Sequence, residues 1–255
     1  MIEDIKDKVF FISGSTSGIG LGLAKNLVIN GAKVIITGTS IEKINLIKRN
    51  DLFNNKNSLI LKKDLTNKNN CKFSIDKSIS KFRKIDCLLL NLGSGKRDNI
   101  LSDEDNTAIK KMYEINFWPS YNLINSSLPH LIKSKGNVIS LSTICATSII
   151  ENAPLGYSLS KIALLKMIKI FAKRYAKYSI RFNSIVPGNI MFPGSTWDLK
   201  KLDNSIFVKK YIKNNVPLNK FGSIDDIFNA VIYLSNSHSK FITGTEVILD
   251  GGQTI

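Results

Sequence analysis

The stretch that decides the fold lies close to the amino terminus and reads Val9-Phe10-Phe11-Ile12-Ser13-Gly14-Ser15-Thr16-Ser17-Gly18-Ile19-Gly20. Its four consecutive apolar residues predict a strand that is buried on both faces, as in a parallel sheet. A segment with helical periodicity follows from about Gly18 to Asn30, and Gly31 is a typical helix stop. Glycines at such a turn let the backbone approach a pyrophosphate, which the helix amino terminus attracts. The spacing is GxxxGxG, not the GxGxxG fingerprint, so a purely structural turn is also compatible with it.

The same alternation of short apolar runs and helical segments continues along the chain. Further strands are predicted at 34–36, 59–61, 87–90, 138–141, 180–186 and 246–249, and helices near 41–50, 70–82, 103–134 and 157–178. Neither a linker nor an internal repeat interrupts the pattern. We therefore expect one α/β domain over residues 1–255, with a Rossmann-like, doubly wound parallel sheet and helices on both faces. The least regular stretch, 192–220, is expected to form a substrate lid.

Composition is typical of a globular protein, with 43% hydrophobic and 22% charged residues among 255. The 36 Lys+Arg and 20 Asp+Glu leave a net charge of +16, which can mark a nucleic-acid partner. Here the lysines are scattered among asparagines, as in Asn67-Lys68-Asn69-Asn70, whereas a nucleic-acid footprint clusters Arg and Lys with aromatics. We expect solvated basic faces and no nucleic-acid partner.

The cysteines and the apolar runs predict where in the cell the protein is located. Cys71, Cys87 and Cys145 are far apart and form no CxxC pair, which argues against disulfides and a zinc site. His130 and His238 are equally separated, so no metal is expected. The first eight residues include acidic side chains and resemble no signal peptide, and no run approaches the ~20 apolar residues of a membrane span. We expect a cytoplasmic protein with no membrane partner.

The end of the second strand predicts the cofactor type. In a dinucleotide site, an acidic residue there accepts a hydrogen bond from the ribose 2′-hydroxyl of NAD and repels a 2′-phosphate. The chain instead has Thr37-Gly38-Thr39-Ser40, with Glu42 only in the next helix and Lys43 close by. This pattern favours NADP(H) over NAD(H).

Tyr157 and Lys161 are four residues apart, so they lie on one face of a helix. A nearby ammonium favours the phenolate and lowers the pKa of a tyrosine toward the range of acid–base catalysis. Ser142-Thr143 follows another strand and supplies hydroxyls that could bind the same carbonyl oxygen.

Taken together, these motifs resemble the short-chain dehydrogenase/reductase family over nearly the whole chain. The resemblance rests on motifs in family order: Gly14 to Gly20, Asp64-Leu65-Thr66, Asn91-Leu92-Gly93, Asn116, Ser142-Thr143, Tyr157-x-x-x-Lys161, Pro187-Gly188, Thr243-Gly244 and Asp250-Gly251-Gly252. It implies that Tyr157 is the general acid, that Lys161 also holds the nicotinamide ribose, and that Asn116 holds a relay water. Pro119 is expected to relax the helix around Asn116 locally, which would free a carbonyl for that water.

The implied cofactor contacts follow the strand ends. They comprise Gly14, Ser15, Thr16, Ser17, Gly18, Ile19, Gly20, Thr37, Thr39, Ser40, Asp64, Leu65, Asn91, Gly93, Tyr157, Lys161, Pro187, Gly188 and Ile190.

The sequence departs from the family pattern at three places. One is the motif after the fourth strand, where the usual paired asparagines are reduced to Leu90-Asn91-Leu92-Gly93. Thr143 replaces the substrate-polarising serine and is preferred over its rival Ser142. Phe192 stands where a threonine often helps to bind the nicotinamide, which leaves Ser195 or Thr196 for that contact. Trp197 is a candidate apolar wall over the substrate, and ordinary packing is the alternative. Substrate contacts are therefore expected from Thr143, Tyr157 and Trp197.

The implied activity is hydride transfer between NADP(H) and a carbonyl/secondary alcohol pair. The pattern is most similar to the 3-oxoacyl-[acyl-carrier-protein] reductases, with Thr37-x-Thr39-Ser40 and Pro217-Leu218-x-Lys220-x-Gly222. The substrate would then be a small-molecule or carrier-linked carbonyl compound such as a 3-oxoacyl thioester. Sugar, polyol or hydroxy-acid dehydrogenases share these features, and a non-catalytic dinucleotide-binding regulator or nucleic-acid-binding protein is a third hypothesis. The resemblance also implies a homotetramer.

Overall fold

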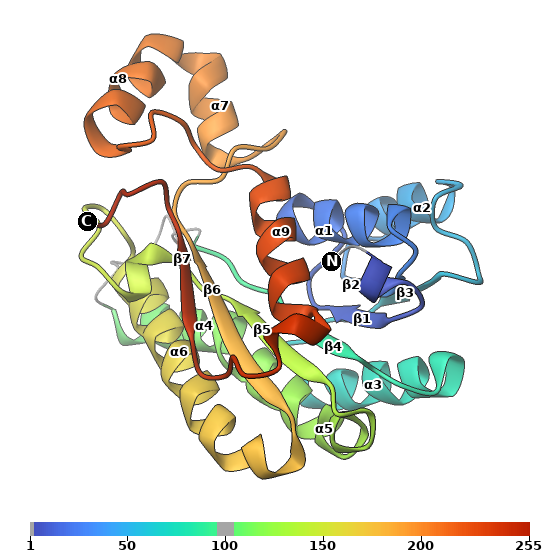
Figure 1. Ribbon diagram of the computed structural model, residues 1–255. Helices are drawn as coiled ribbons and strands as arrows, with labels where there is room; N and C mark the ends of the chain where they lie inside the picture. Colours follow the sequence, from blue (N-terminus) through green and yellow to red (C-terminus); the bar gives the residue numbers. More distant parts are fainter. Residues whose placement is uncertain (1–2, 96–104) are drawn as a thin grey trace.

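A parallel sheet forms the centre of the computed structural model, which describes residues 3–95 and 105–255. Within these residues the sheet has seven strands in the order β3-β2-β1-β4-β5-β6-β7 (Figure 1). The strands are β1 (Val9–Ile12), β2 (Lys33–Gly38), β3 (Ser58–Lys62), β4 (Cys87–Leu90), β5 (Asn137–Leu141), β6 (Arg181–Pro187) and β7 (Glu246–Leu249). The order reverses direction between β1 and β4, so the carboxyl ends of these two strands flank the usual ligand crevice of such sheets.

Helices cover both faces of this sheet, which confirms the predicted doubly wound α/β fold (Figure 1). One face packs on α1 (Gly18–Ile29), α2 (Ile41–Lys48) and α9 (Ile224–Ser235). The other packs on α3 (Lys68–Phe82), α5 (Trp118–Ser134) and α6 (Leu155–Tyr175), with α4 (Asn106–Asn116) against α6.

The unbroken apolar runs follow from this double cover. Phe10 and Ile12 of β1 belong to the core beneath α1 and α9, whereas Val9 and Phe11 belong to the core beneath α3, α5 and α6. All four side chains are at most 1% exposed. Because successive side chains of a strand point to opposite faces, a strand covered on both sides must be apolar throughout.

The prediction of one continuous helix over 103–134 is wrong, because the structure has two helices there. Residues 103–104 lie outside the described residues, and α4 begins at Asn106. It ends at Asn116, Phe117 serves as the cap of both helices, and α5 begins at Trp118 with Pro119 in its first turn. Proline lacks the N–H that a continuous helix requires, so it is favoured in the first turn of a helix, although α5 also contains Pro129 in its interior. The predicted relaxation at Pro119 is thus a full break between helices.

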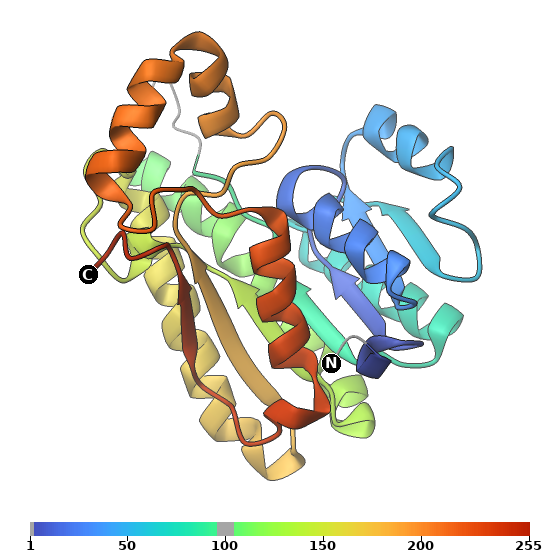
Figure 2. The same cartoon turned by 45° about the horizontal axis from the view of Figure 1, so that its top comes forward.

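The segment predicted as a lid contains two helices, α7 (Thr196–Asp203) and α8 (Ser205–Asn215). They project from the three-layered body beyond the carboxyl ends of the strands (Figure 2). Among the described residues, no helix has both the length and the apolarity that crossing a bilayer requires.

Candidate active site

The glycine-rich loop connects β1 to α1 at the crevice. Gly14 and Gly18 have φ of 62° and 58°, in the left-handed region that favours glycine. A Cβ on Gly14 would also lie 2.9 Å from a Leu92 side-chain carbon, so this position has no room for a side chain. Ser17 is the N-cap of α1 but makes no side-chain capping hydrogen bond. The first N–H groups of α1 therefore remain available to an anion.

Ser15 and Thr37 were predicted as cofactor contacts, but their side chains hold the loop itself. Both residues are fully buried. Ser15 Oγ donates to the Ile12 carbonyl at 2.6 Å and accepts from the Thr37 N–H at 3.1 Å. Thr37 Oγ1 in turn accepts from the Gly14 N–H at 3.1 Å. The two hydroxyls thereby tie the ends of β1 and β2 together.

Asn91, after β4, supports the loop from its other side. Its Nδ2 donates to the Ser13 and Gly14 carbonyls at 2.9 Å each. Ser13 Oγ accepts from the backbone N–H groups of Asn91 and Leu92, both at 3.0 Å. The sequence analysis did not single out Ser13, although its place directly after an apolar strand and before Gly14 is a usable signal.

A cation lies beside the glycine-rich loop. Lys43, in the first turn of α2, donates from Nζ to Ser17 Oγ at 3.3 Å. Ser40 Oγ caps α2 by accepting from the Lys43 N–H, and both Thr39 and Glu42 are exposed. A Cβ on Gly38 would overlap the Thr16 side chain, which fixes glycine at the end of β2.

The remaining predicted cofactor contacts occupy turns at the same sheet edge. Asp64 is exposed and accepts from the Thr66 N–H and hydroxyl at 3.0 and 2.8 Å. The Leu65 and Ile190 side chains are 3% and 7% exposed and pack in the core. Pro187 ends β6, and the Gly188 N–H donates to the Leu249 carbonyl at 2.9 Å. Leu65 and Ile190 can therefore meet a ligand only through their backbone.

Tyr157 and Thr143 lie together, as predicted. Tyr157 is in the first turn of α6, Thr143 follows β5, and the Thr143 side chain lies near the Tyr157 hydroxyl. Burial raises the pKa of Tyr157 to about 12, Cys145 adds to the rise, and the neighbouring Thr143 side chain opposes it. Ser142 is 5% exposed, and its Oγ is buried without a hydrogen-bond partner. Of the two rival hydroxyls, Thr143 is thus the one that contacts the tyrosine.

Lys161 lies one turn further along α6, but its ammonium is bound elsewhere. Its Nζ donates to the Leu141 carbonyl at 2.8 Å, and the residue is 3% exposed. Burial lowers the pKa of Lys161 to about 8. The expected lowering of the tyrosine pKa by Lys161 is not found in this structure, because burial dominates the ionisation of Tyr157.

Asn116 and the loop after β4 complete the cluster. A Cβ on Gly93 would lie 2.8 Å from Asn116 Oδ1 and 2.9 Å from Lys161 Nζ, so Gly93 brings both groups together. Asn116 Oδ1 accepts from the Ser94 N–H at 2.8 Å, and its Nδ2 donates to the Ser94 carbonyl at 3.1 Å. The Asn116 side chain, expected to hold a water, therefore clamps this loop.

Trp197 takes part in an aromatic cluster at the base of the lid. Its ring centroid lies 4.3 Å from that of Tyr211 and 4.7 Å from that of Phe221. Ser195 Oγ caps α7 by accepting from the Asp198 N–H, while Thr196 is exposed. The Phe192 ring lies against Gly18, since a Cβ there would be 3.4 Å from it. Trp197 is thus half-buried in this cluster, and Phe192 forms a wall of the glycine-rich loop.

In the part of the chain that the structure describes, no group of three His, Cys, Asp or Glu side chains could hold a metal ion. The cluster of Tyr157, Thr143, Lys161 and Asn116 offers acid–base and hydrogen-bonding groups.

Known proteins share this sequence pattern over almost the full length. A family model described as Enoyl-(Acyl carrier protein) reductase matches residues 14–254. The 3-oxoacyl-[acyl-carrier-protein] reductase of Buchnera aphidicola subsp. Acyrthosiphon pisum (strain APS) is 31% identical over 251 residues, covering 98% of each chain. The L-fucose dehydrogenase of Bos taurus is 28% identical over 248 residues, covering 96% of this chain and 88% of that one.

A solved structure has the same architecture. That of ElxO with NADP bound is 28% identical, with a TM-score of 0.85 over 97% of this chain and 98% of that one. The site geometry and the full-length matches agree with the resemblance seen in the motifs. The chain belongs to the short-chain dehydrogenase/reductase family of oxidoreductases, which act on alcohol and carbonyl groups.

Proposed function

We propose that the protein is an NADP(H)-dependent reductase of a carbonyl group, with Tyr157 as the general acid. One observation carries the proposal: the Tyr157 hydroxyl lies near Thr143, Lys161 and Asn116, at the same sheet edge as the glycine-rich loop. Acid–base groups next to a dinucleotide cradle are what carbonyl reduction needs.

The residues at the crevice fit a dinucleotide cofactor. The positive φ of Gly14 and Gly18 and the N-terminus of α1, which has no side-chain cap, make a cradle for a diphosphate. The glycine-rich loop, Asn91 and Gly93 would hold the cofactor, together with Asp64 and the Gly188–Ile190 backbone. When bound, its nicotinamide supplies or accepts a hydride.

The protein's own groups handle the proton and the developing charge. With a pKa of about 12, Tyr157 is protonated at neutral pH and has a proton to donate to a carbonyl oxygen. Thr143 can donate a second hydrogen bond to that oxygen. Lys161 is mostly charged at neutral pH because its pKa is about 8, and a buried cation stabilises a developing alkoxide.

The preference for NADP(H) is supported by charge at the junction of β2 and α2. Lys43 Nζ lies 3.3 Å from Ser17 Oγ, directly beside the glycine-rich loop. Residues 37–40 carry no carboxylate that would repel a 2′-phosphate. The similar structure of ElxO has NADP bound, which is compatible with the same choice here.

For the substrate we propose a 3-oxoacyl thioester, carried by a small molecule or by a carrier protein. The similarity to a 3-oxoacyl-[acyl-carrier-protein] reductase supports this class. A sugar substrate is the second candidate, because an L-fucose dehydrogenase is also similar over nearly the whole chain. We also propose a homotetramer that works in the cytoplasm, where Cys71, Cys87 and Cys145 would remain the free thiols that the structure has.

Steady-state kinetics test the proposal. NADPH oxidation would be followed with acetoacetyl thioester and with a simple ketone, and NADP⁺ reduction with L-fucose. We expect the highest kcat/KM for the thioester, with NADPH preferred over NADH. Higher kcat/KM for L-fucose would favour the sugar candidate. Absence of turnover with the whole panel, although NADPH binds, would favour a non-catalytic role.

A further inference from the structure

A second cavity opens at the opposite edge of the sheet, where the strands begin. Its volume is about 840 Å³, within the range of small-molecule sites. Lys8 and Asp86 directly precede β1 and β4, and Asn137 and Arg181 are the first residues of β5 and β6. The catalytic groups follow the other ends of these strands. At about 3.3 Å per residue, the five residues of β5 alone separate the two sites by roughly 16 Å.

The lining of this cavity is strongly positive. It includes the cations Lys8, Lys135, Arg181 and Lys240 against one carboxylate, Asp86. That carboxylate is engaged by Lys84, which is not among the lining residues, at 2.9 Å. Within residues 3–95 and 105–255, the Nζ atoms of Lys135 and Lys240 have neither a hydrogen-bond acceptor nor an ion-pair partner. The cavity therefore favours an anion.

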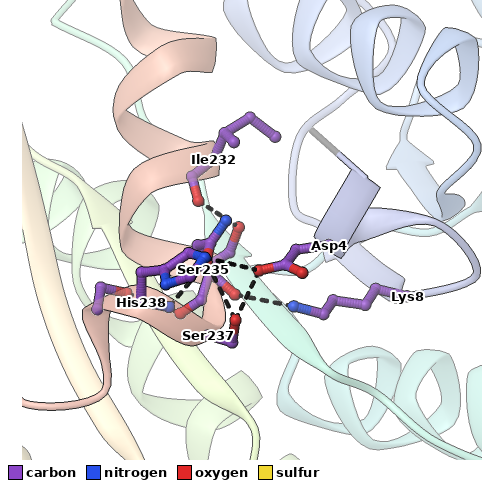
Figure 3. Close-up of polar contacts among 8 residues, drawn as sticks. Asp4, Lys8, Ile232, Ser235, Ser237 and His238 are labelled. Carbon is purple, nitrogen blue, oxygen red and sulfur yellow. Dashed lines mark hydrogen bonds and ion pairs between the residues drawn. The ribbon is translucent and has the colours of Figure 1, made fainter. Parts of the chain in front are cut away.

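Hydrogen bonds fix part of this wall. Arg181 donates to the Leu234 and Ile242 carbonyls at 2.6 and 3.2 Å, and burial lowers its pKa. Figure 3 shows Lys8 reaching the end of α9, where its Nζ donates to the Ser235 carbonyl at 3.2 Å. The nearby Asp4 accepts from Ser237 Oγ at 2.6 Å. Two of the cations are thus held in place by backbone carbonyls.

Asn137 adds no accessible acceptor to the wall. The residue is 7% exposed, and its side-chain Oδ1 is fully buried. A ligand in the cavity therefore cannot reach this oxygen. The exposed side chains of Lys135 and Lys240 are the groups that select the ligand.

We propose that this cavity binds a small phosphate ester. A phosphate monoester has close to two negative charges at neutral pH, which matches the two unpaired lysines. The site is separate from the active site and does not depend on the proposed substrate.

Three probes separate the contribution of the phosphate charge to binding from that of the hydroxyl groups. Glycerol 3-phosphate has the charge and the hydroxyl groups, methyl phosphate has the charge only, and glycerol has the hydroxyl groups only. Binding would be measured by calorimetry with NADPH saturating, so that the glycine-rich loop is occupied. We expect both phosphates to bind and glycerol not to bind. Binding of glycerol as tight as that of the phosphates, or no binding of either phosphate, would overturn the proposal.

Variants assign the binding to this cavity. The double variant Lys135→Gln/Lys240→Gln should weaken both phosphates by at least about tenfold. Lys133→Gln is the matched control, because Lys133 is exposed on the same helix end but does not line the cavity. Unchanged affinity in the double lysine variant would place the phosphate elsewhere and contradict the proposal.

Discussion

The two hydroxyls at the end of β5 differ in their surroundings although they are adjacent. Thr143 lies near the Tyr157 hydroxyl, whereas Ser142 Oγ is buried without a partner. We expect Thr143→Val to lower kcat by about 10²-fold, because a donor to the reacting oxygen is lost, and Thr143→Ser to keep most activity. Ser142→Ala should leave kcat nearly unchanged. Steady-state kinetics check this, and a larger loss for Ser142→Ala than for Thr143→Val would reverse the assignment.

The burial of Lys161 predicts how the free energy of unfolding depends on pH. Its pKa falls from 10.5 to about 8 in the folded protein because of burial. Below about pH 8 Lys161 is protonated in both the folded and the unfolded protein, so the free-energy cost of burying its charge does not change with pH. As the pH rises from about 8 to 10.5, the unfolded chain keeps a proton that the folded one has lost, and the free energy of unfolding rises.

The variant Lys161→Met removes this titration. The stability of the wild type relative to this variant should therefore increase by about 3 kcal/mol across that pH window. Urea unfolding of both proteins at neutral pH and near pH 10 measures the difference. A pH-independent difference would show that Lys161 titrates at its ordinary pKa.

At the scale of elements, the β2–α2 junction is expected to select the cofactor. Replacing Lys43 by alanine should weaken NADPH binding by about tenfold and leave NADH binding unchanged, because only the 2′-phosphate loses a cation. Lys48→Ala, in the last turn of the same helix, is the control. Titration calorimetry with both cofactors measures the ratio, and equal losses for NADPH and NADH would contradict this role. Gly38→Asp is a poor test, since its Cβ would overlap Thr16.

Elements with a strong local signal could be predicted from the sequence. The β1–α1 unit is one, because Val9 to Ile12 are apolar and Gly31, with φ of 82°, ends the helix. The division between α4 and α5 was missed, because the apolar periodicity continues across Phe117 while Pro119 alone marks the new start. The partners of Ser15, Asn116 and Lys161 could not be predicted either, since each depends on a carbonyl or N–H that tertiary structure brings close.

For the whole molecule, the resemblance implied a homotetramer, and the surface agrees with self-association. Trp118 and Tyr121 on α5 and Leu159, Ile162 and Ile170 on α6 are between 37% and 47% exposed. Exposed apolar side chains on neighbouring helices favour association. Light scattering should give a multiple of the 28.4 kDa chain mass, and Ile162→Glu should shift the protein toward the monomer. A monomeric wild type at micromolar concentration would contradict this expectation.

The sheet order and the family could be predicted at this scale, but the second cavity could not. Asn137 and Arg181 are ordinary strand-start residues in the sequence, and Lys135 and Lys240 are two among many lysines. Only the fold brings these residues, over one hundred positions apart at the extremes, to a common edge of the sheet. Their spacing carries no periodic or motif signal.

The central claim, that Tyr157 donates the proton in a carbonyl reduction, is tested most directly by the kcat of Tyr157→Phe with saturating NADPH and an accepted substrate. The ring and its packing are retained, and only the hydroxyl beside Thr143 is lost. We predict a fall in kcat of about 10²- to 10⁴-fold, with NADPH affinity by calorimetry nearly unchanged. Turnover close to that of the wild type would contradict the assignment of Tyr157 as the general acid.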